Sequence, residues 1–377
     1  MRPIHNAMKR RNISLWIMGG IWVLMLLVNL AARLSRPLTD WYISAVFPLI
    51  SGFWSRVSGI FPFSVGEWMI VGTVVLIALP VIGLPLVLLF GKDRKLHILS
   101  IAAQVYGWIG TWVAVIVTMR FLVLYQGTQL SQTLGDVEYS NKQVLSAVRE
   151  LVTAANAESE QVARDENGYM ILSEDLMQEA KACMERLSRE YPQYRGYYPD
   201  AKPIHHAYFF SQQNLLGIYY PHSMEANYNP VVYEVNLPVT VCHEYTHLKG
   251  NIFEDEAGYY AFLACMTSES HDFRYSALIC ALEWLDVDFG EDEQAWQEYY
   301  TIRESCSPGV CRDMYAFVPE EYWDTHKDTD EVIPTQLVSD TAEKMMDASL
   351  KVNGITEGMH SYHGMTALLL HHLLEES

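Results

Sequence analysis

Three long apolar stretches lie in the first third of the chain. They cover roughly residues 13–32, 69–90 and 98–124. Each reaches the roughly 20 residues that a helix needs to cross a bilayer. Pro80, Gly83 and Pro85 interrupt the second stretch, which transmembrane helices tolerate better than soluble ones. The first stretch is too long for a signal peptide and no small-residue cleavage site follows it. The pattern predicts a membrane domain of three transmembrane α-helices over residues 1–125.

Shorter patterns follow over residues 126–377. Apolar positions recur at helical spacing in residues 141–163, 173–187, 239–249, 253–267, 273–285, 293–306, 335–352 and 362–374. Between these helices, three short segments are typical of strands: residues 205–210, 215–220 and 224–228. Helices around a short sheet predict an α+β domain. The segment 224–228 is either an ordinary strand or an edge strand that pairs with an extended peptide.

Charge divides the chain at the same place. Residues 1–125 hold 11 Lys and Arg against 3 Asp and Glu, so the remainder holds 26 − 11 = 15 basic and 45 − 3 = 42 acidic residues. The second part therefore has a formal balance near 15 − 42 = −27. A domain this acidic repels phosphate backbones, which excludes nucleic acid as a partner.

The loops around the spans differ in positive charge. Arg2 and Lys9 to Arg11 precede the first span, and Lys92, Arg94 and Lys95 lie between the second and third. Because short cytoplasmic loops carry the excess of Lys and Arg, we expect the N-terminus and the second loop in the cytoplasm and residues 126–377 outside it. The first loop is rich in aromatic residues, and we expect it to lie along the outer membrane interface.

All six cysteines follow the membrane part: Cys183, Cys242, Cys265, Cys280, Cys306 and Cys311. An exported setting permits disulfides, and Cys306 and Cys311 enclose a turn at Pro308 that a disulfide could close. Cys183, Cys265 and Cys280 lie in helical apolar patterns. We expect these three to be small buried residues.

The clearest chemistry lies in the motif His243-Glu244-Tyr245-Thr246-His247. On a helix, His243 and His247 share a face, so their imidazoles can bind one zinc ion. Glu244 stands beside the first histidine, where it can take a proton from an activated water and pass it to a leaving amine. Apolar rather than charged residues flank the motif. The sequence therefore predicts a Zn²⁺ site with Glu244 as general base.

A catalytic zinc ion usually has three protein ligands. Glu254, Asp255 and Glu256 open the next helix, beginning seven residues after His247. Glu254 and Glu256 are both candidate ligands, and they point about 200° apart on an ideal helix, so only one can face the metal. Asp255 is better explained by the favourable position of an acidic residue at a helix N-terminus.

The ordered motifs resemble a bacterial family of uncharacterised membrane proteins, the domain-of-unknown-function family 3810. They are the three-span N-terminus, Gly217–Pro221, Glu225–Asn227, His243–His247, Glu254–Ala257 with Leu263–Cys265, Arg274–Ser276, and Asn353–Tyr362. The resemblance runs over nearly the whole chain. Its second metal motif is similar to the Glu-x-x-Ala-Asn/Asp pattern of gluzincin peptidases, which implies Glu254 as the third ligand. Gly258 stands where that pattern has a polar residue.

The same resemblance places the loop around Tyr362 after the catalytic core. It implies that Tyr362 donates a hydrogen bond to a developing oxyanion, with His360 as the weaker candidate. We therefore expect a zincin-like (gluzincin) domain that acts as a membrane-anchored zinc metallopeptidase on a peptide or protein at the outer face of the lipid bilayer. The alternative is a non-catalytic sensor or binding module with the same fold.

Overall fold

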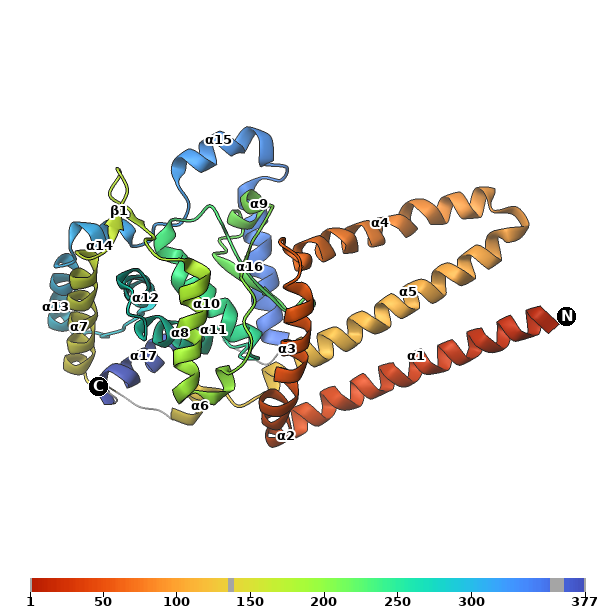
Figure 1. Ribbon diagram of the computed structural model, residues 1–377, viewed down its shortest axis with the longest axis horizontal. Helices are drawn as coiled ribbons and strands as arrows, with labels where there is room; N and C mark the ends of the chain where they lie inside the picture. Colours follow the sequence, from red (N-terminus) through yellow and green to blue (C-terminus); the bar gives the residue numbers. More distant parts are fainter. Residues whose placement is uncertain (1, 135–138, 353–362, 376–377) are drawn as a thin grey trace.

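Three long helices extend from one end of the molecule (Figure 1). The computed structural model describes residues 2–134, 139–352 and 363–375. The long helices are α1 (Arg2–Leu34), α4 (Val65–Phe90) and α5 (Lys95–Val117). Each belongs to a segment long and apolar enough to cross a membrane. In α4, no residue of the most apolar stretch is buried inside the protein. The prediction of three membrane-span helices is confirmed at this level.

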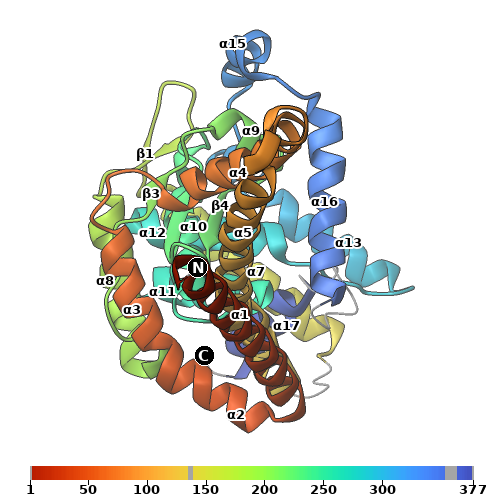
Figure 2. The same cartoon turned by 90° about the vertical axis from the view of Figure 1, so that its right-hand side faces the viewer.

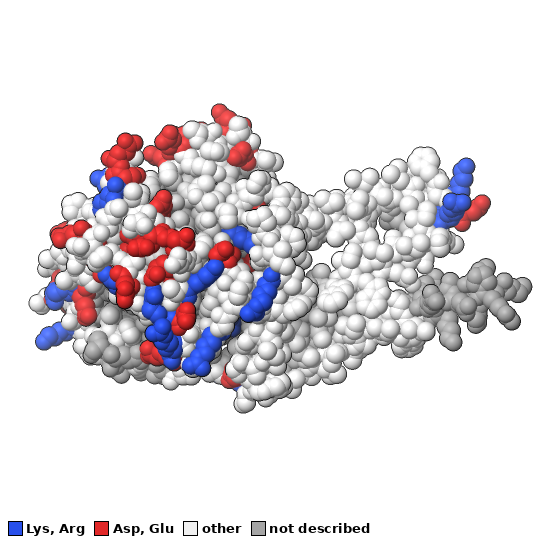
Figure 3. Space-filling view, viewed as in Figure 1, with Lys and Arg blue, Asp and Glu red and all other residues white. Residues whose placement is uncertain are grey.

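Hydrogen bonds between polar side chains connect the apolar helices α1 and α5. The indole of Trp22 donates to Thr111 Oγ1 at 3.2 Å, and Asn29 Nδ2 donates to Oγ1 of Thr118, the residue directly after α5, at 3.1 Å. Interhelical hydrogen bonds of this kind are a common means of joining helices where lipid gives no hydrophobic driving force. On the face shown in Figure 3, the projecting helices are otherwise largely free of charge up to their far end. Lipid is the solvent that suits such a surface.

The chain between the first two spans is helical. It forms α2 (Arg36–Trp41), the π-helix η1 (Tyr42–Val46) and α3 (Phe47–Ser58), which lie across the base of the long helices (Figures 1 and 2). One face of α3 is buried and carries Phe47, Ser51, Ser55 and Ser58. The aromatic-rich loop expected from the sequence is therefore an ordered pair of helices packed on the globular part.

Helices make up most of the globular part. They are α7 (Asn141–Ser159), α8 (Leu176–Glu190), α10 (Leu237–Leu248), α11 (Glu254–Met266), α12 (His271–Trp284), α13 (Glu293–Glu304), α14 (Pro308–Asp313), α15 (Glu320–Asp330), α16 (Thr335–Val352) and α17 (His363–Glu375). The eight helices predicted from apolar spacing are all present, and α14 and α15 were not predicted. Almost every residue of α10 and α11 is buried, so these two helices form the centre of the core.

A three-stranded sheet packs against α10. It consists of β3 (Lys202–Pro203), β4 (Gly217–Tyr220) and β5 (Glu225–Tyr228) in the order β3-β5-β4. β3 is parallel and β4 antiparallel to β5. A separate hairpin pairs β1 (Ala163–Arg164) with β2 (Met170–Ile171). The predicted strands at 215–220 and 224–228 are confirmed, but β5 is the central strand, so the hypothesis that 224–228 forms a free edge is wrong. The edge strands are β3 and β4.

The predicted strand over residues 205–210 is wrong, because this segment forms the short helix α9 (Ala207–Ser211). Glu67, in the first turn of α4, accepts hydrogen bonds from the backbone N–H groups of His205 and His206, each at 2.8 Å. Because the Glu67 carboxylate accepts hydrogen bonds from these two N–H groups at the start of a helix, the groups cannot donate to a neighbouring strand. A contact between residues far apart in the sequence thus overrides the local pattern.

All six cysteines lie in the described residues and are free thiols. The disulfide expected between Cys306 and Cys311 is absent. Ser307 instead caps α14, and the Cys311 thiol contacts the Cys306 carbonyl oxygen at 3.6 Å. Cys183 and Cys265 are fully buried and Cys280 is partly buried, as expected of small apolar residues.

Candidate metal centre

The helix α10 carries the predicted motif through the middle of the globular part. Pro238 lies in its first turn, where a missing N–H has no cost. The helix ends at Leu248, and Gly250, two residues later, adopts a left-handed φ of +99° and donates its N–H to the His247 carbonyl at 2.9 Å. Glycine is common just after a helix end because it adopts this conformation without strain. The chain then turns back, and α11 begins at Glu254 beside the two histidines.

Three ligand-type atoms converge between α10 and α11. The Nε2 atoms of His243 and His247 are 3.0 Å apart. Glu254 Oε2 lies 3.0 Å from the first nitrogen and 3.4 Å from the second. The structure thus brings together His243, His247 and Glu254 as a group that could hold a metal ion.

The donor chemistry of this group fits zinc. A tetrahedral zinc ion with bonds of about 2.0–2.1 Å places its ligand atoms roughly 3.3 Å apart. The three observed separations of 3.0, 3.0 and 3.4 Å are close to that value. Two imidazoles and one carboxylate would fill three positions and leave the fourth open, which is the arrangement of a catalytic rather than a structural site.

Asn251 fixes the orientation of His247. The Nδ1 atom of His247 lies 2.7 Å from the Asn251 carbonyl oxygen. A carbonyl can only accept, so Nδ1 carries a proton and Nε2 is the ring atom that faces Glu254 and His243. A partner of this kind on the second ring nitrogen is typical of metal-binding histidines. Nothing in the sequence singled out Asn251, because its contact is made by the backbone.

The electrostatics of the cluster show how strongly its members interact. Burial lowers the pKa of His243. Burial alone would also lower the pKa of His247, but Glu254 and Glu244 raise it to about 9. Burial would raise the pKa of Glu254, but His247 and His243 hold it well below its usual range. A carboxylate kept ionised next to two imidazoles is a site prepared for positive charge.

Glu244 lies behind the cluster, against the sheet. Its side chain is buried, and its Oε2 atom has no hydrogen-bond partner. Burial raises the pKa of Glu244 to about 8, against the opposing effect of His247. An orphaned buried carboxylate oxygen calls for a ligand or a water molecule, and a pKa near neutrality suits a group that must accept and return a proton.

Glu256 points away from the histidines. Its Oε1 atom accepts a hydrogen bond from the Leu130 N–H at 2.5 Å, and its Oε2 atom accepts one from Asn251 Nδ2 at 3.2 Å. Burial raises the pKa of Glu256 to about 8. Of the two carboxylates that are candidate third ligands in the sequence, Glu254 is the one near the histidines. Glu256 instead connects the segment after the third span to the turn between α10 and α11 through its two hydrogen bonds.

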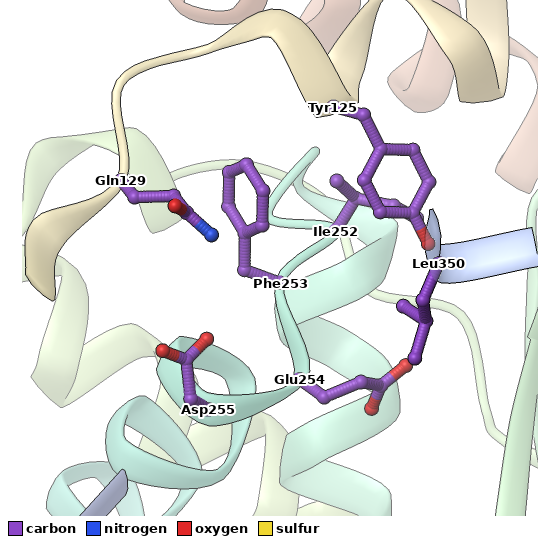
Figure 4. Close-up of a pocket in the computed structure, with 7 residues that line it drawn as sticks. All are labelled: Tyr125, Gln129, Ile252, Phe253, Glu254, Asp255 and Leu350. Atoms are coloured by element: carbon purple, nitrogen blue, oxygen red, sulfur yellow. The ribbon is translucent and has the colours of Figure 1, made fainter. Parts of the chain in front are cut away.

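A small pocket opens beside Glu254 (Figure 4). Its lining comes from three parts of the chain: Tyr125 and Gln129 after the third span, Ile252 to Asp255 at the start of α11, and Leu350 of α16. The ring of Tyr125 packs edge-on against Phe253 with centroids 5.9 Å apart. Asp255 is buried, so its place at the helix N-terminus is not a solvent-facing one. Tyr125 was not predicted as a site residue, because it lies at the end of an apolar span.

Tyr362 and His360, the candidates for an oxyanion donor, lie outside the described residues. Gly258, where gluzincins have a polar residue, lies under α17: an added Cβ atom would meet Met365 Sδ at 2.8 Å. Close packing of α11 and α17 therefore accounts for a glycine at this position.

A family model described as "Protein of unknown function (DUF3810)" matches residues 42–370. No curated protein and no solved structure matches the chain. The matched range takes in α10, the start of α11 and the β4–β5 hairpin, and it covers well over half of the sequence. The chain therefore belongs to the DUF3810 family of proteins of unknown function.

Proposed function

We propose that this protein is a membrane-anchored zinc metallopeptidase that hydrolyses peptide bonds in a peptide or protein substrate. One observation carries the proposal: His243, His247 and Glu254 place their ligand atoms within 4.8 Å of one another, next to the buried and unpaired carboxylate of Glu244. A zinc ion held by the first three residues would supply Lewis acidity to the reaction.

Glu244 would carry the proton transfers. It takes a proton from the attacking water as the water oxygen bonds to the carbonyl carbon of the substrate. It then gives that proton to the amine nitrogen as the carbon–nitrogen bond breaks. Its pKa of about 8 lies close to neutral pH, where the group can pass between its two protonation states. The water-excluding walls around Glu244 strengthen the interactions with the developing charge.

The edge strand β4 offers a guide for the substrate. Gly217, its first residue, lies so close to Glu244 that an added Cβ atom would be 2.7 Å from Oε1. The other edge of β4 pairs with no strand among the described residues. An extended peptide can add to such an edge through backbone hydrogen bonds, which align it without demanding one sequence.

We also propose that the globular part lies outside the cytoplasm. The N-terminus and the α4–α5 turn lie together at the far end of the long helices (Figure 1), and that turn carries Lys92, Arg94 and Lys95. The positive end of a membrane protein stays in the cytoplasm. Protease added to intact spheroplasts should remove the globular part, and complete protection of it would reverse this topology.

A non-catalytic sensor or binding module is the second candidate, and α16 favours it. Leu350 lies beside Glu254 in the pocket, and Ser339 accepts a hydrogen bond from Asn214, just before β4, at 3.2 Å. The helix thus runs alongside the space between β4 and the metal centre. A protein that only binds could keep this space closed.

Peptide cleavage by the purified full chain separates the two functions. The wild type should cut a mixed-sequence peptide library, and Glu244→Gln should cut at least about 100-fold more slowly while it binds zinc normally. Equal cleavage by both proteins would remove Glu244 from the reaction. Failure of the wild type to cut any member would favour the binding module.

A further inference from the structure

The strand β4 joins the metal centre to the start of a membrane span. Its first residue, Gly217, lies against Glu244, and its last, Tyr220, lies against Gly66 in the first turn of α4, where an added Cβ atom would meet the Tyr220 ring at 2.3 Å. Three residue steps along a strand cover about 10 Å. The place of the proposed bond cleavage is therefore about 10 Å along the strand from the beginning of the second span.

The start of α4 is clamped to the sheet. The backbone N–H of Gly66 donates to Glu225 Oε2 at 2.7 Å, and that of Val65 donates to Oε1 at 3.3 Å. Glu225 is only 1% exposed and also forms an ion pair with buried Lys202. A carboxylate at the N-terminus of a helix is favoured by the helix dipole, and burial makes this one hard to displace. The distance between the span and the metal centre is therefore fixed.

The end of the third span and the helix α3 also form hydrogen bonds with the part of the globular domain that faces the membrane-span helices. Arg120, at the end of the third span, donates to the His222 carbonyl at 3.0 Å. Ser51 of α3 donates to the Leu248 carbonyl, at the end of α10, at 2.5 Å. The outer side of α3 is apolar, with Leu49 73% and Phe53 61% exposed. This side suits the interfacial layer of a bilayer.

The hydrogen-bonding pattern of β4 leaves part of its backbone for a partner. The Asn229 N–H donates to the Leu216 carbonyl at 2.7 Å, which makes that pair a hydrogen-bonded one in the antiparallel register. Hydrogen-bonded and non-hydrogen-bonded pairs alternate. Gly217 and Tyr219 therefore direct their N–H and C=O groups to the outer edge of β4, next to Glu244 at one end and towards α4 at the other.

We propose that the substrate is the juxtamembrane segment of another membrane-anchored protein, cut within about ten residues of its span. This inference rests on the peptidase function proposed above. An extended chain aligned on β4 has one end at Glu244 and the other at the level where α4 enters the bilayer. A segment emerging from the membrane reaches this position directly, whereas a folded soluble protein would have to press against the lipid surface and α3.

The test uses the full chain in liposomes with a series of designed substrates. Each substrate has one transmembrane helix, a flexible linker of about 5 or about 40 residues and the same mixed-sequence cassette, and the cassette alone serves as the free peptide. Both anchored substrates share the same surface concentration, so the comparison between linkers is not a tethering effect.

We expect the cassette to be cut at least about ten-fold faster behind the short linker than behind the long one or when free. Equal rates for all three would overturn the juxtamembrane substrate and leave the peptidase function intact. Cleavage of none of them, and of no peptide in detergent, would overturn the peptidase function and this inference together. Glu244→Gln, assayed in parallel, shows whether the measured cleavage belongs to this site.

Discussion

Replacing Gly217 with alanine should lower catalysis without removing the metal. An added Cβ atom would lie 2.6 Å from Thr240 Cγ2, 2.7 Å from Glu244 Oε1 and 2.9 Å from Glu244 Cγ. Ordinary contact begins at 3.4 Å, so the carboxylate would have to withdraw by about 3.4 − 2.7 = 0.7 Å. The three atoms nearest to the added Cβ atom belong to Thr240 and Glu244, and none belongs to His243, His247 or Glu254.

The magnitude follows from that displacement. Misplacing a reacting group by about 1 Å can cost roughly 100-fold in rate, so Gly217→Ala should lower kcat by about 10- to 100-fold. Overpacking of a tight core typically costs about 1–3 kcal/mol of stability, so the variant should melt at a lower temperature and remain folded at 25 °C. Its zinc content should equal that of the wild type.

The assay combines initial cleavage rates, zinc analysis and thermal melting of the purified full chain. Gly72→Ala in α4 is the matched control, because nothing lies within 4 Å of an added Cβ atom there. Adding Thr240→Ser to Gly217→Ala removes the nearest contact but not the one with Glu244, so activity should recover only in part. Wild-type kcat in Gly217→Ala would refute the placement of Glu244 against β4.

Two further predictions concern the elements around the centre. Lys202→Met leaves Glu225 buried without its cation and should lower the free energy of unfolding by about 3–5 kcal/mol, measured by chemical denaturation. The control Lys181→Met, at an exposed ion pair, should change the free energy of unfolding little. Equal effects of the two variants would contradict a buried Glu225 that holds the start of α4. Oxidised Asn214→Cys/Ser339→Cys should fix α16 against the segment before β4 and cut activity at least about ten-fold, with recovery on reduction. Unchanged activity after confirmed disulfide formation would show that α16 need not move.

The membrane-span helices and the helix α10 with its candidate metal ligands could be predicted because their signals are local. An apolar run of about 20 residues matches the thickness of a bilayer and is longer than most buried helices of soluble proteins need. Two histidines four residues apart share a face on any helix. Likewise, the strands β4 and β5 follow from short apolar patterns between turns.

The remaining features depend on contacts between distant segments. Glu254 and Glu256 are equivalent in the sequence, and what separates them is the Leu130 N–H, which binds Glu256. The order β3-β5-β4 cannot be read from the strands themselves, so the sequence left open whether residues 224–228 form an ordinary strand or an edge strand. The packing of α3 on Leu248 likewise could not be predicted, because the only signal in the loop between the first two spans was its content of aromatic residues.

The zinc content of the purified full chain tests the central claim most directly. Metal analysis should find one zinc ion per chain in the wild type and in Glu256→Gln, and well below one in Glu254→Ala, because Glu254 lies 3.0 Å from His243 Nε2 whereas Glu256 binds Leu130. Thermal melting of the same samples shows that the variants are folded. Loss of zinc from Glu256→Gln with retention in Glu254→Ala would contradict the assigned ligand, and a folded wild type that binds no zinc would contradict the proposed metal centre and the peptidase function with it.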